Sequence, residues 1–332
     1  DKSRFVLTGL GEIDVDKTVL RLLQVIKSNI LPEIWNIDIV GVRLSGSKGY
    51  ALVIKIPRGA YQPYRSELTK KFTIRRSNKN EDMTVEELRR AFNLSATFIN
   101  EANQIRAERI ANISNGKTPY PVTEGFKVAL HIIPFSALGF GQRIDLSDLG
   151  QKAKTPQWAK SLGFYEGKHN QYGFACEFNL REQPVSGYTY ISRKGIIETV
   201  LCFHFPEDFK LIGLHRLEFM ILHFMKQASI ILQNLHISPP FIVMASLLDL
   251  EGYQAHPIYD IRMQNIPTFQ LQGKIYIFED NQIRLDDIVM ERFPDDYGVD
   301  LRPLFDELYN VAGHNCSPNY DNEGNWKEPQ KP

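Results

Sequence analysis

A dense run of basic residues between Lys55 and Lys79 is the part of this sequence best suited to chemistry. It holds eight Lys and Arg residues against a single acid, Glu67. Such a local excess of positive charge is the electrostatic footprint of a surface that meets phosphates. A charged face that only keeps the protein in solution would give the same count, so composition alone does not separate these two interpretations.

Two arginines and two tyrosines in this run are the central candidates. Arg75 and Arg76 are adjacent in a predicted strand, so their side chains point to opposite faces. A guanidinium can donate two parallel hydrogen bonds to one phosphate, and a loop tyrosine can stack on a base. The alternative places the tyrosines in the core and one arginine in an internal ion pair. The predicted nucleic-acid-binding set is Arg58, Tyr61, Tyr64, Arg65, Lys70, Lys71, Arg75, Arg76 and Lys79.

Other pairs of reactive residue types have weaker patterns. His215 and Glu218 share a face of a predicted helix, but metal sites on helices use tighter sets such as HExxH. Cys202 and His204 share a face of a predicted strand, but no third member of a catalytic set accompanies them. We therefore predict no metal site and no cofactor, and we leave open whether the protein is an enzyme.

Residues 41–48 superficially resemble a phosphate-binding loop. The lysine does not directly follow the second glycine, and the context is strand–turn–strand instead of strand–loop–helix. We predict a hairpin turn there. The acid-rich stretch 279–307 likewise lacks the D-x-D-x-D-G pattern of a calcium loop. We favour solvated turns there, and the alternative is an acidic surface that faces the basic half of a neighbouring subunit.

The composition is that of an ordinary globular protein, with 43% hydrophobic and 23% charged residues among 332. This length suffices for two domains. Residues 1–118 hold 20 Lys and Arg against 13 Asp and Glu, whereas the other 214 residues hold 19 against 26. The formal net charge of zero therefore hides a basic first third and an acidic remainder.

Several features indicate a cytoplasmic protein. No apolar stretch approaches the roughly 18–20 residues that cross a bilayer. The three cysteines, Cys176, Cys202 and Cys316, form no CxxC pair, which suits free thiols in a reducing compartment. The opening residues lack both Met and the order of a secretion signal. We expect further residues upstream of Asp1, and no membrane partner.

The elements that position the basic run can be predicted from local patterns. We predict a helix over 19–29 capped by Asp16, and a hairpin of strands 37–44 and 50–56 around a turn at 45–49. A further strand covers 72–76. Thr84 and Glu87 form a capping box that opens a long helix reaching Arg109.

The rest of the chain is predicted to be a larger α+β domain. Asn, Gly and Pro gather at 112–121, which we interpret as the domain boundary. The predicted domains are 1–112, 119–314 and a loosely ordered polar tail at 315–332. Predicted strands cover 126–133, 172–177, 189–192, 195–205, 241–248 and 274–278, and predicted helices cover 211–235 and 301–311.

Residues 30–92 resemble the second half of the AlbA-type domain of Schlafen proteins and of many bacterial helix-turn-helix-associated proteins. Four pieces carry this resemblance in order. They are Ile30-Leu31-Pro32-Glu33-Ile34, Val53-Ile54-Lys55-Ile56-Pro57, Gln62-Pro63-Tyr64, and Phe72-Thr73-Ile74-Arg75-Arg76-Ser77 leading to Glu87-Leu88-Arg89. The resemblance covers roughly the first third of the chain and implies a small mixed α/β domain ahead of the larger α+β one. The segments 109–116 and 131–134 also resemble the region after this domain in its bacterial relatives.

The sequence departs from this family at two places. Arg76-Ser77-Asn78 stands where the family has a glycine before the serine. The family's opening portion, an E-x-K strand and a glycine-rich hairpin, is not visible ahead of Phe5. In vertebrate Schlafens that resemble this domain, acidic residues near that opening carry ribonuclease activity, so no catalytic site is transferred to this chain.

The resemblance implies a nucleic-acid-binding protein of bacterial type that acts in regulation or in defence. Two alternatives stay open. One is a Schlafen-like metal-dependent nuclease whose acidic site lies in the absent front portion, and the other is an oligomeric assembly protein. We expect a homo-oligomer, and the sequence does not choose between DNA and RNA.

Overall fold

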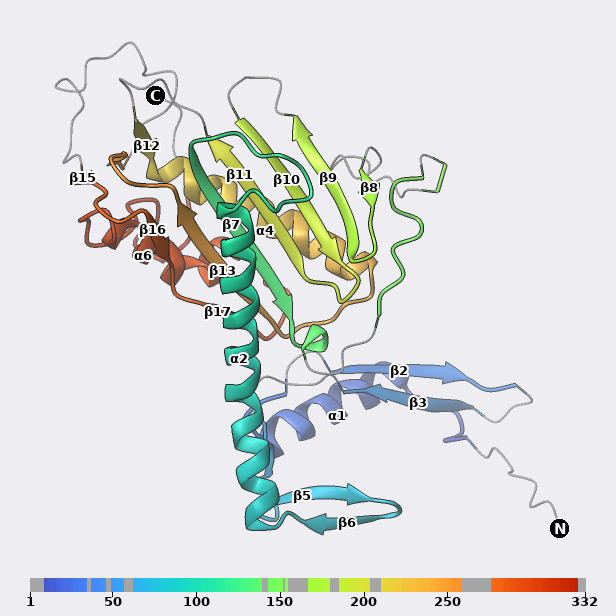
Figure 1. Cartoon of the computed structure of the whole chain (residues 1–332). Helices are drawn as coiled ribbons and strands as arrows, with labels where there is room; N and C mark the ends of the chain where they lie inside the picture. Colours follow the sequence, from blue (N-terminus) through green and yellow to red (C-terminus); the bar gives the residue numbers. More distant parts are fainter. Residues whose placement is uncertain are drawn as a thin grey trace. The chain divides into compact units, whose positions relative to one another are not determined.

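The chain forms an α+β fold that divides into two compact units. The computed structural model describes residues 9–34, 37–45, 49–56, 62–138, 143–151, 153–154, 167–179, 185–203, 210–257 and 276–327. Unit 1 is Asp1–Ile99 and unit 2 is Asn100–Pro332. Helices and several sheets together confirm the predicted fold class (Figure 1). The division falls inside helix α2 (Val85–Ser114), and residues 112–121 belong to unit 2.

Unit 1 opens with helix α1 (Val15–Asn29), which starts earlier than predicted. Asp14, not Asp16, is its N-cap, because the Asp14 backbone is extended and its side chain accepts a hydrogen bond from the Lys17 N–H at 3.0 Å. Asp16 lies in the first turn, where its negative charge complements the helix dipole.

Two small sheets complete unit 1. The predicted hairpin is confirmed as strands β2 (Asp38–Arg43) and β3 (Tyr50–Lys55), which pair antiparallel. A second sheet has the order β1-β4-β5-β6, with β1 (Ile30–Leu31), β4 (Arg65–Ser66), β5 (Lys71–Arg76) and β6 (Lys79–Asp82). Strand β6 was not predicted because its four residues are polar and all exposed, so they show no apolar alternation.

The predicted capping box starts α2. The Thr84 hydroxyl accepts from the Glu87 N–H at 3.2 Å, and the Glu87 carboxylate accepts from the Thr84 N–H at 2.8 Å. Phe72 on β5 meets Phe92 on α2 edge to face, with ring centroids 6.0 Å apart. This aromatic pair attaches the β5–β6 hairpin to the first half of α2.

Unit 2 is built on an eight-stranded antiparallel sheet with the order β16-β13-β7-β11-β10-β9-β8, in which β17 also pairs with β13. Its strands are β7 (Phe126–Pro134), β8 (Lys168–His169), β9 (Gly173–Asn179), β10 (Val185–Ser192), β11 (Ile197–Phe203), β13 (Phe241–Leu248), β16 (Gln282–Arg284) and β17 (Ile288–Met290). A smaller sheet joins β12 (Leu211–Gly213), β14 (Gln254–His256) and β15 (Tyr276–Ile277), and a 3-10 turn, η1 (Phe135–Ala137), follows β7.

Helices cover both faces of the large sheet. Figure 1 shows α4 (Leu214–Asn234) behind it and the second half of α2 in front. The main core lies on the α4 side and includes residues of α5 (Tyr297–Asp300) and α6 (Arg302–Asn310). A smaller apolar cluster lies on the α2 side, where Ile110 and Ile113 pack with Tyr188 and Val200. No helix in the described part of the chain has the length and apolar character needed to cross a membrane.

The polar segment after α6 is folded against unit 2 through Lys327, contrary to the loosely ordered tail that we predicted. The Tyr320 hydroxyl donates to the Gly298 carbonyl at 2.7 Å, and Trp326 packs against the main core. The prediction failed because these two aromatic anchors are isolated in a polar segment, where no hydrophobic periodicity reveals them.

Candidate nucleic-acid interface

Unit 2 contains a cleft of about 930 Å³. Its walls come from the last turns of α2, the segment after α2, Arg143, the β8–β9 turn and the β10–β11 hairpin. The lining residues are Ile105, Glu108, Arg109, Asn112, Lys117, Thr118, Pro119, Arg143, Asn170, Gln171, Tyr172, Tyr190, Ser192, Arg193, Lys194, Ile196 and Glu198.

A buried carboxylate, Glu198, forms the floor of this cleft with its side chain only 1% exposed. Arg109 donates to both of its oxygens, from Nε and Nη2, at 2.7 Å each. The Tyr188 hydroxyl donates to Oε1 at 2.7 Å, and His131 Nε2 lies 3.0 Å from Oε2. Each carboxylate oxygen therefore has two partners, as a buried charge requires.

Strand register brings this group together. Glu198 on β11 lies directly opposite His131 on β7 and opposite Tyr190 on β10. Residues directly opposite in antiparallel strands project on the same face, which here is the face covered by α2. Arg109 reaches this row from the helix, and its guanidinium lies over the Tyr190 ring at 5.7 Å.

The floor carries a neutralised pair of charges. Burial acts to raise the pKa of Glu198, but the hydrogen bonds and charges of Arg109 and His131 outweigh burial and hold this pKa at about 2. The hydrogen bond to Glu198 raises the pKa of Arg109. Both groups are thus ionised at neutral pH, and each cancels the charge of the other. A ligand in the cleft meets free charge only at the rim.

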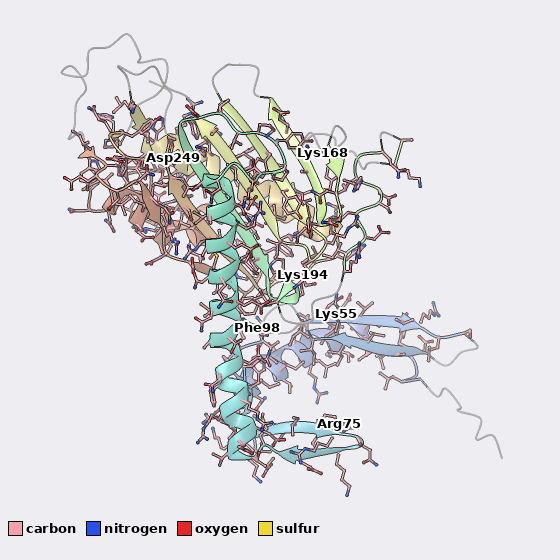
Figure 2. All side chains as sticks on the ribbon, viewed as in Figure 1. Lys55, Arg75, Phe98, Lys168, Lys194 and Asp249 are labelled. Carbon is pink, nitrogen blue, oxygen red and sulfur yellow. The ribbon has the colours of Figure 1, made fainter. Side chains whose placement is uncertain are left out.

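Four cations stand at the rim, namely Lys117, Arg143, Arg193 and Lys194. None of them makes an ion pair within 4 Å with a carboxylate among the residues that the structure describes. One further carboxylate lines the cleft, that of the exposed Glu108. Lys194 lies at the opposite end of the sheet from Asp249 (Figure 2). The rim is therefore positively charged on balance.

Tight turns hold the rim residues in place. In the β10–β11 turn, the Ser192 hydroxyl accepts from the N–H groups of Lys194 at 3.2 Å and Ile196 at 3.0 Å. Gly195 follows with φ at +86°, a conformation that favours glycine. In the β8–β9 turn, Asn170 Oδ1 accepts from the N–H groups of Tyr172 at 2.9 Å and of Gly173 at 2.8 Å.

The predicted binding residues belong to unit 1, and none of them is among the residues that line this cleft. Arg58 and Tyr61 are outside the described residues. Tyr64 is half-buried, and the six remaining cations lie on β4, β5, β6 and the β4–β5 turn. We call the hairpin of β5 and β6, residues 71–82, the ribbon. Lys168 of unit 2 stacks on Tyr120 and does not line the cleft.

Most of these cations have carboxylate partners. Lys71 Nζ lies 2.6 Å from Asp82, and Arg76 Nη1 lies 2.9 Å from Glu81. Arg76 also pairs with Glu87. In the β4–β5 turn, Glu67 accepts from both Lys70 and Arg65, and these two contacts lower its pKa.

Two ribbon cations have no carboxylate partner among the described residues. Arg75 contacts the Asn80 amide oxygen at 3.3 Å, and the exposed Lys79 makes no ion pair there. The count of charged residues made from the sequence ends at Lys79. It therefore leaves out Glu81, Asp82 and Glu87, which follow soon after in the sequence and pair with Lys71 and Arg76. The net charge of the ribbon is therefore lower than the count indicates.

Sequence reasoning did not find the cleft. The available signals were a histidine and a glutamate inside apolar strands, at His131 and Glu198, and a basic Arg193-Lys194-Gly195 turn. Each signal is weak by itself, because a single buried polar residue is common. Of the other candidates, Cys202 is a buried free thiol whose Sγ donates to the Thr123 carbonyl, and His204 lies outside the described residues.

Within the described ranges, no three His, Cys, Asp or Glu side chains gather as a metal ion would require. Comparisons with protein-family models, with curated proteins and with solved structures find no match to this chain. Function is therefore inferred from the geometry of the cleft and the ribbon.

Proposed function

We propose that the protein binds nucleic acid, and that the rim of the unit 2 cleft receives backbone phosphates. The observation that carries this proposal is the set of four rim cations without described carboxylate partners, set against one free carboxylate, Glu108. Lys and Arg that are not already paired can exchange counterions for phosphates, which is the main source of affinity for a nucleic acid.

The composition of the cleft favours a nucleic acid over an isolated phosphate or a small acid. Its volume of about 930 Å³ is much larger than one phosphate requires, and its wall includes an exposed aromatic ring, Tyr172, and three amide side chains. Aromatic rings beside cations are the usual combination where bases and phosphates are bound together. The amides can donate to or accept from base edges.

The ribbon supplies a second, weaker contact in this proposal. Arg75 and Lys79 are its cations without described carboxylate partners. Its paired cations are solvent-exposed, and exposed ion pairs contribute at most about 1 kcal/mol, so a phosphate can compete with the carboxylates. The resemblance of residues 30–92 to an AlbA-type domain supports the same class of ligand.

The test is a fluorescence-anisotropy titration of the full chain with single-stranded RNA, duplex RNA and duplex DNA at two salt concentrations. The variant carries Lys117→Glu and Lys194→Glu. Its matched control is Lys226→Glu with Lys210→Glu, two exposed lysines that do not line the cleft. We expect salt-dependent binding that weakens about ten-fold in the variant, with a salt slope shallower by about 0.7 for each lost single-strand contact.

The outcomes separate the alternatives. Equal affinities of the wild type, the variant and the control would remove the cleft from nucleic-acid binding and overturn the proposal. No salt-sensitive binding at all would favour the assembly protein. Incubation of the chain with labelled tRNA and Mg²⁺ addresses the nuclease alternative, which a cleaved product would support.

A further inference from the structure

Two rim residues that differ in chemistry, Tyr172 and Arg193, are fixed side by side. The Arg193 N–H donates to the Tyr172 carbonyl at 2.8 Å, and the Arg193 carbonyl accepts from the Ile144 N–H at 2.7 Å. Both side chains line the cleft. The β8–β9 turn and the β10–β11 turn are therefore joined through backbone hydrogen bonds where these two side chains begin.

The backbones of the two turns pack closely where they meet. A Cβ added at Gly173, the residue after Tyr172, would lie 2.0 Å from the Ile191 carbonyl oxygen. Asn170 closes the same turn from the other side, since its Oδ1 holds the N–H groups of both Tyr172 and Gly173. Tyr172 is thus presented on a rigid turn, although its own side chain packs against little.

Tyr172 is 67% exposed. An exposed aromatic ring at the edge of a basic cleft offers a flat face on which a base can stack. A base inside a duplex is already stacked between its neighbours and cannot present its face to the ring without leaving the helix. The ring therefore discriminates in favour of unpaired bases.

Arg193 has no ion-pair partner among the described residues, and an anionic ligand can provide one. Its Nε is buried and has no hydrogen-bond partner among the described residues. A ligand in the cleft does not reach this buried atom, but Arg193 lines the cleft, and an anionic oxygen placed there can neutralise the charge of its guanidinium. Hydrogen bonds from Ser147 lower the pKa of Asp145 and the charge of Arg193 lowers it further, but no ion pair joins Asp145 and Arg193 within 4 Å.

We infer that Tyr172 and Arg193 form a slot for one unstacked nucleotide of a single strand, with the base on the tyrosine ring and its phosphate on the guanidinium. This inference rests on the proposed function and adds the class of nucleic acid, because such a slot selects single strands over duplexes. The slot uses the phosphate and the face of the base, which RNA and DNA share.

The experiment compares Tyr172→Ala with Tyr172→Phe, which keeps the ring, in the full chain. Binding is measured to a labelled single strand, to a duplex of the same sequence, and to a single strand with abasic sites that keeps the phosphates. We expect Tyr172→Ala to weaken single-strand binding about ten-fold, the range of one base–aromatic stack, while Tyr172→Phe stays near the wild type. Duplex binding should not change in either variant.

The abasic strand completes a thermodynamic cycle. Abasic sites should cost the wild type about as much affinity as the loss of the ring, and Tyr172→Ala should not weaken abasic binding further. Arg193→Ala should weaken binding to both single strands. Thermal melting of each variant checks that the fold is retained, which the exposure of Tyr172 favours.

Failure of the slot and failure of the proposed function give different results. Salt-dependent binding that is equal for single strands and duplexes, and that Tyr172→Ala leaves unchanged, overturns the slot but keeps the basic rim. Loss of all salt-dependent binding overturns both. Competition by a mononucleotide at the same concentration as the oligonucleotide would overturn the requirement for a strand.

Discussion

The ribbon of unit 1 and the cleft of unit 2 are both rich in Lys and Arg, but they differ in where the carboxylates lie. In the ribbon, Lys71 and Arg76 meet Asp82 and Glu81 from the neighbouring strand. In the cleft, the one carboxylate deep in the site is engaged by Arg109, and the rim is left without described ion-pair partners. The number of cations is therefore a poorer guide to a binding surface than the position of the nearest acids.

Burial makes a second difference between the two regions. The ribbon pairs lie in solvent, with both side chains of the Lys71–Asp82 pair 57% exposed, whereas Glu198 is 1% exposed. Exposed pairs are screened by water and salt, and buried pairs are screened much less. The cleft floor should therefore be rigid and costly to disturb, and the ribbon should tolerate changes.

The largest expected effect is on stability, and it tests this difference between a buried and an exposed pair. Arg109→Ala leaves Glu198 buried without its main cation, so we expect the free energy of unfolding to fall by about 3–5 kcal/mol in urea denaturation. Lys71→Ala, which removes an exposed pair, should cost less than about 1 kcal/mol. Similar losses in the two variants would contradict the contrast between a buried and an exposed pair.

A second prediction concerns Glu218, a buried carboxylate of α4 that has no cation beside it among the described residues. Burial raises its pKa to about 7, and nearby Asp306 adds to this rise. The Asn319 amide from the C-terminal segment donates to its Oε2. Tyr309 and Tyr320 also face this carboxylate. Burial raises the pKa values of both tyrosines, and the charge of Glu218 raises them further.

The sign of the pH dependence is set by the raised pKa. Because the folded state holds this proton more tightly than the unfolded state, stability is fully present below the ordinary pKa of 4.5 and falls until the pH passes about 7. The loss is on the order of 3 kcal/mol. Glu218→Gln can still accept the hydrogen bond from Asn319 and removes the titration, so its melting temperature should change less between pH 5 and pH 8. A wild-type slope retained in this variant would assign the pH dependence to other groups.

The smallest predicted effect tests the ribbon. Glu81→Gln with Asp82→Asn frees Lys71 and leaves Arg76 paired with Glu87 alone, so nucleic-acid affinity should rise several-fold and the salt slope should steepen by about 0.7. The control is Glu124→Gln with Glu251→Gln, which removes the same charge from exposed positions outside the cleft. An equal gain in the control would attribute the effect to net charge and not to freed ribbon cations.

Local patterns predicted several elements correctly. The capping box of Thr84 and Glu87 and the hairpin of β2 and β3 depend on residues a few positions apart, so the sequence reveals them directly. Long apolar runs also located the central strands, and β13 occupies 241–248 as predicted. The start of α1 was misplaced because Asp14 and Asp16 are both suitable caps, and only backbone geometry chooses between them.

The sequence by itself determined the α+β class, the main strands and helices, and a chain with a basic first third. Only the tertiary structure decided which charges are free. Strand register places Glu198 beside His131, 67 positions away, and folds Asp82 back onto Lys71. Ion pairing depends on distances of a few ångströms in space, and spacing along the chain does not fix those distances beyond one turn or hairpin.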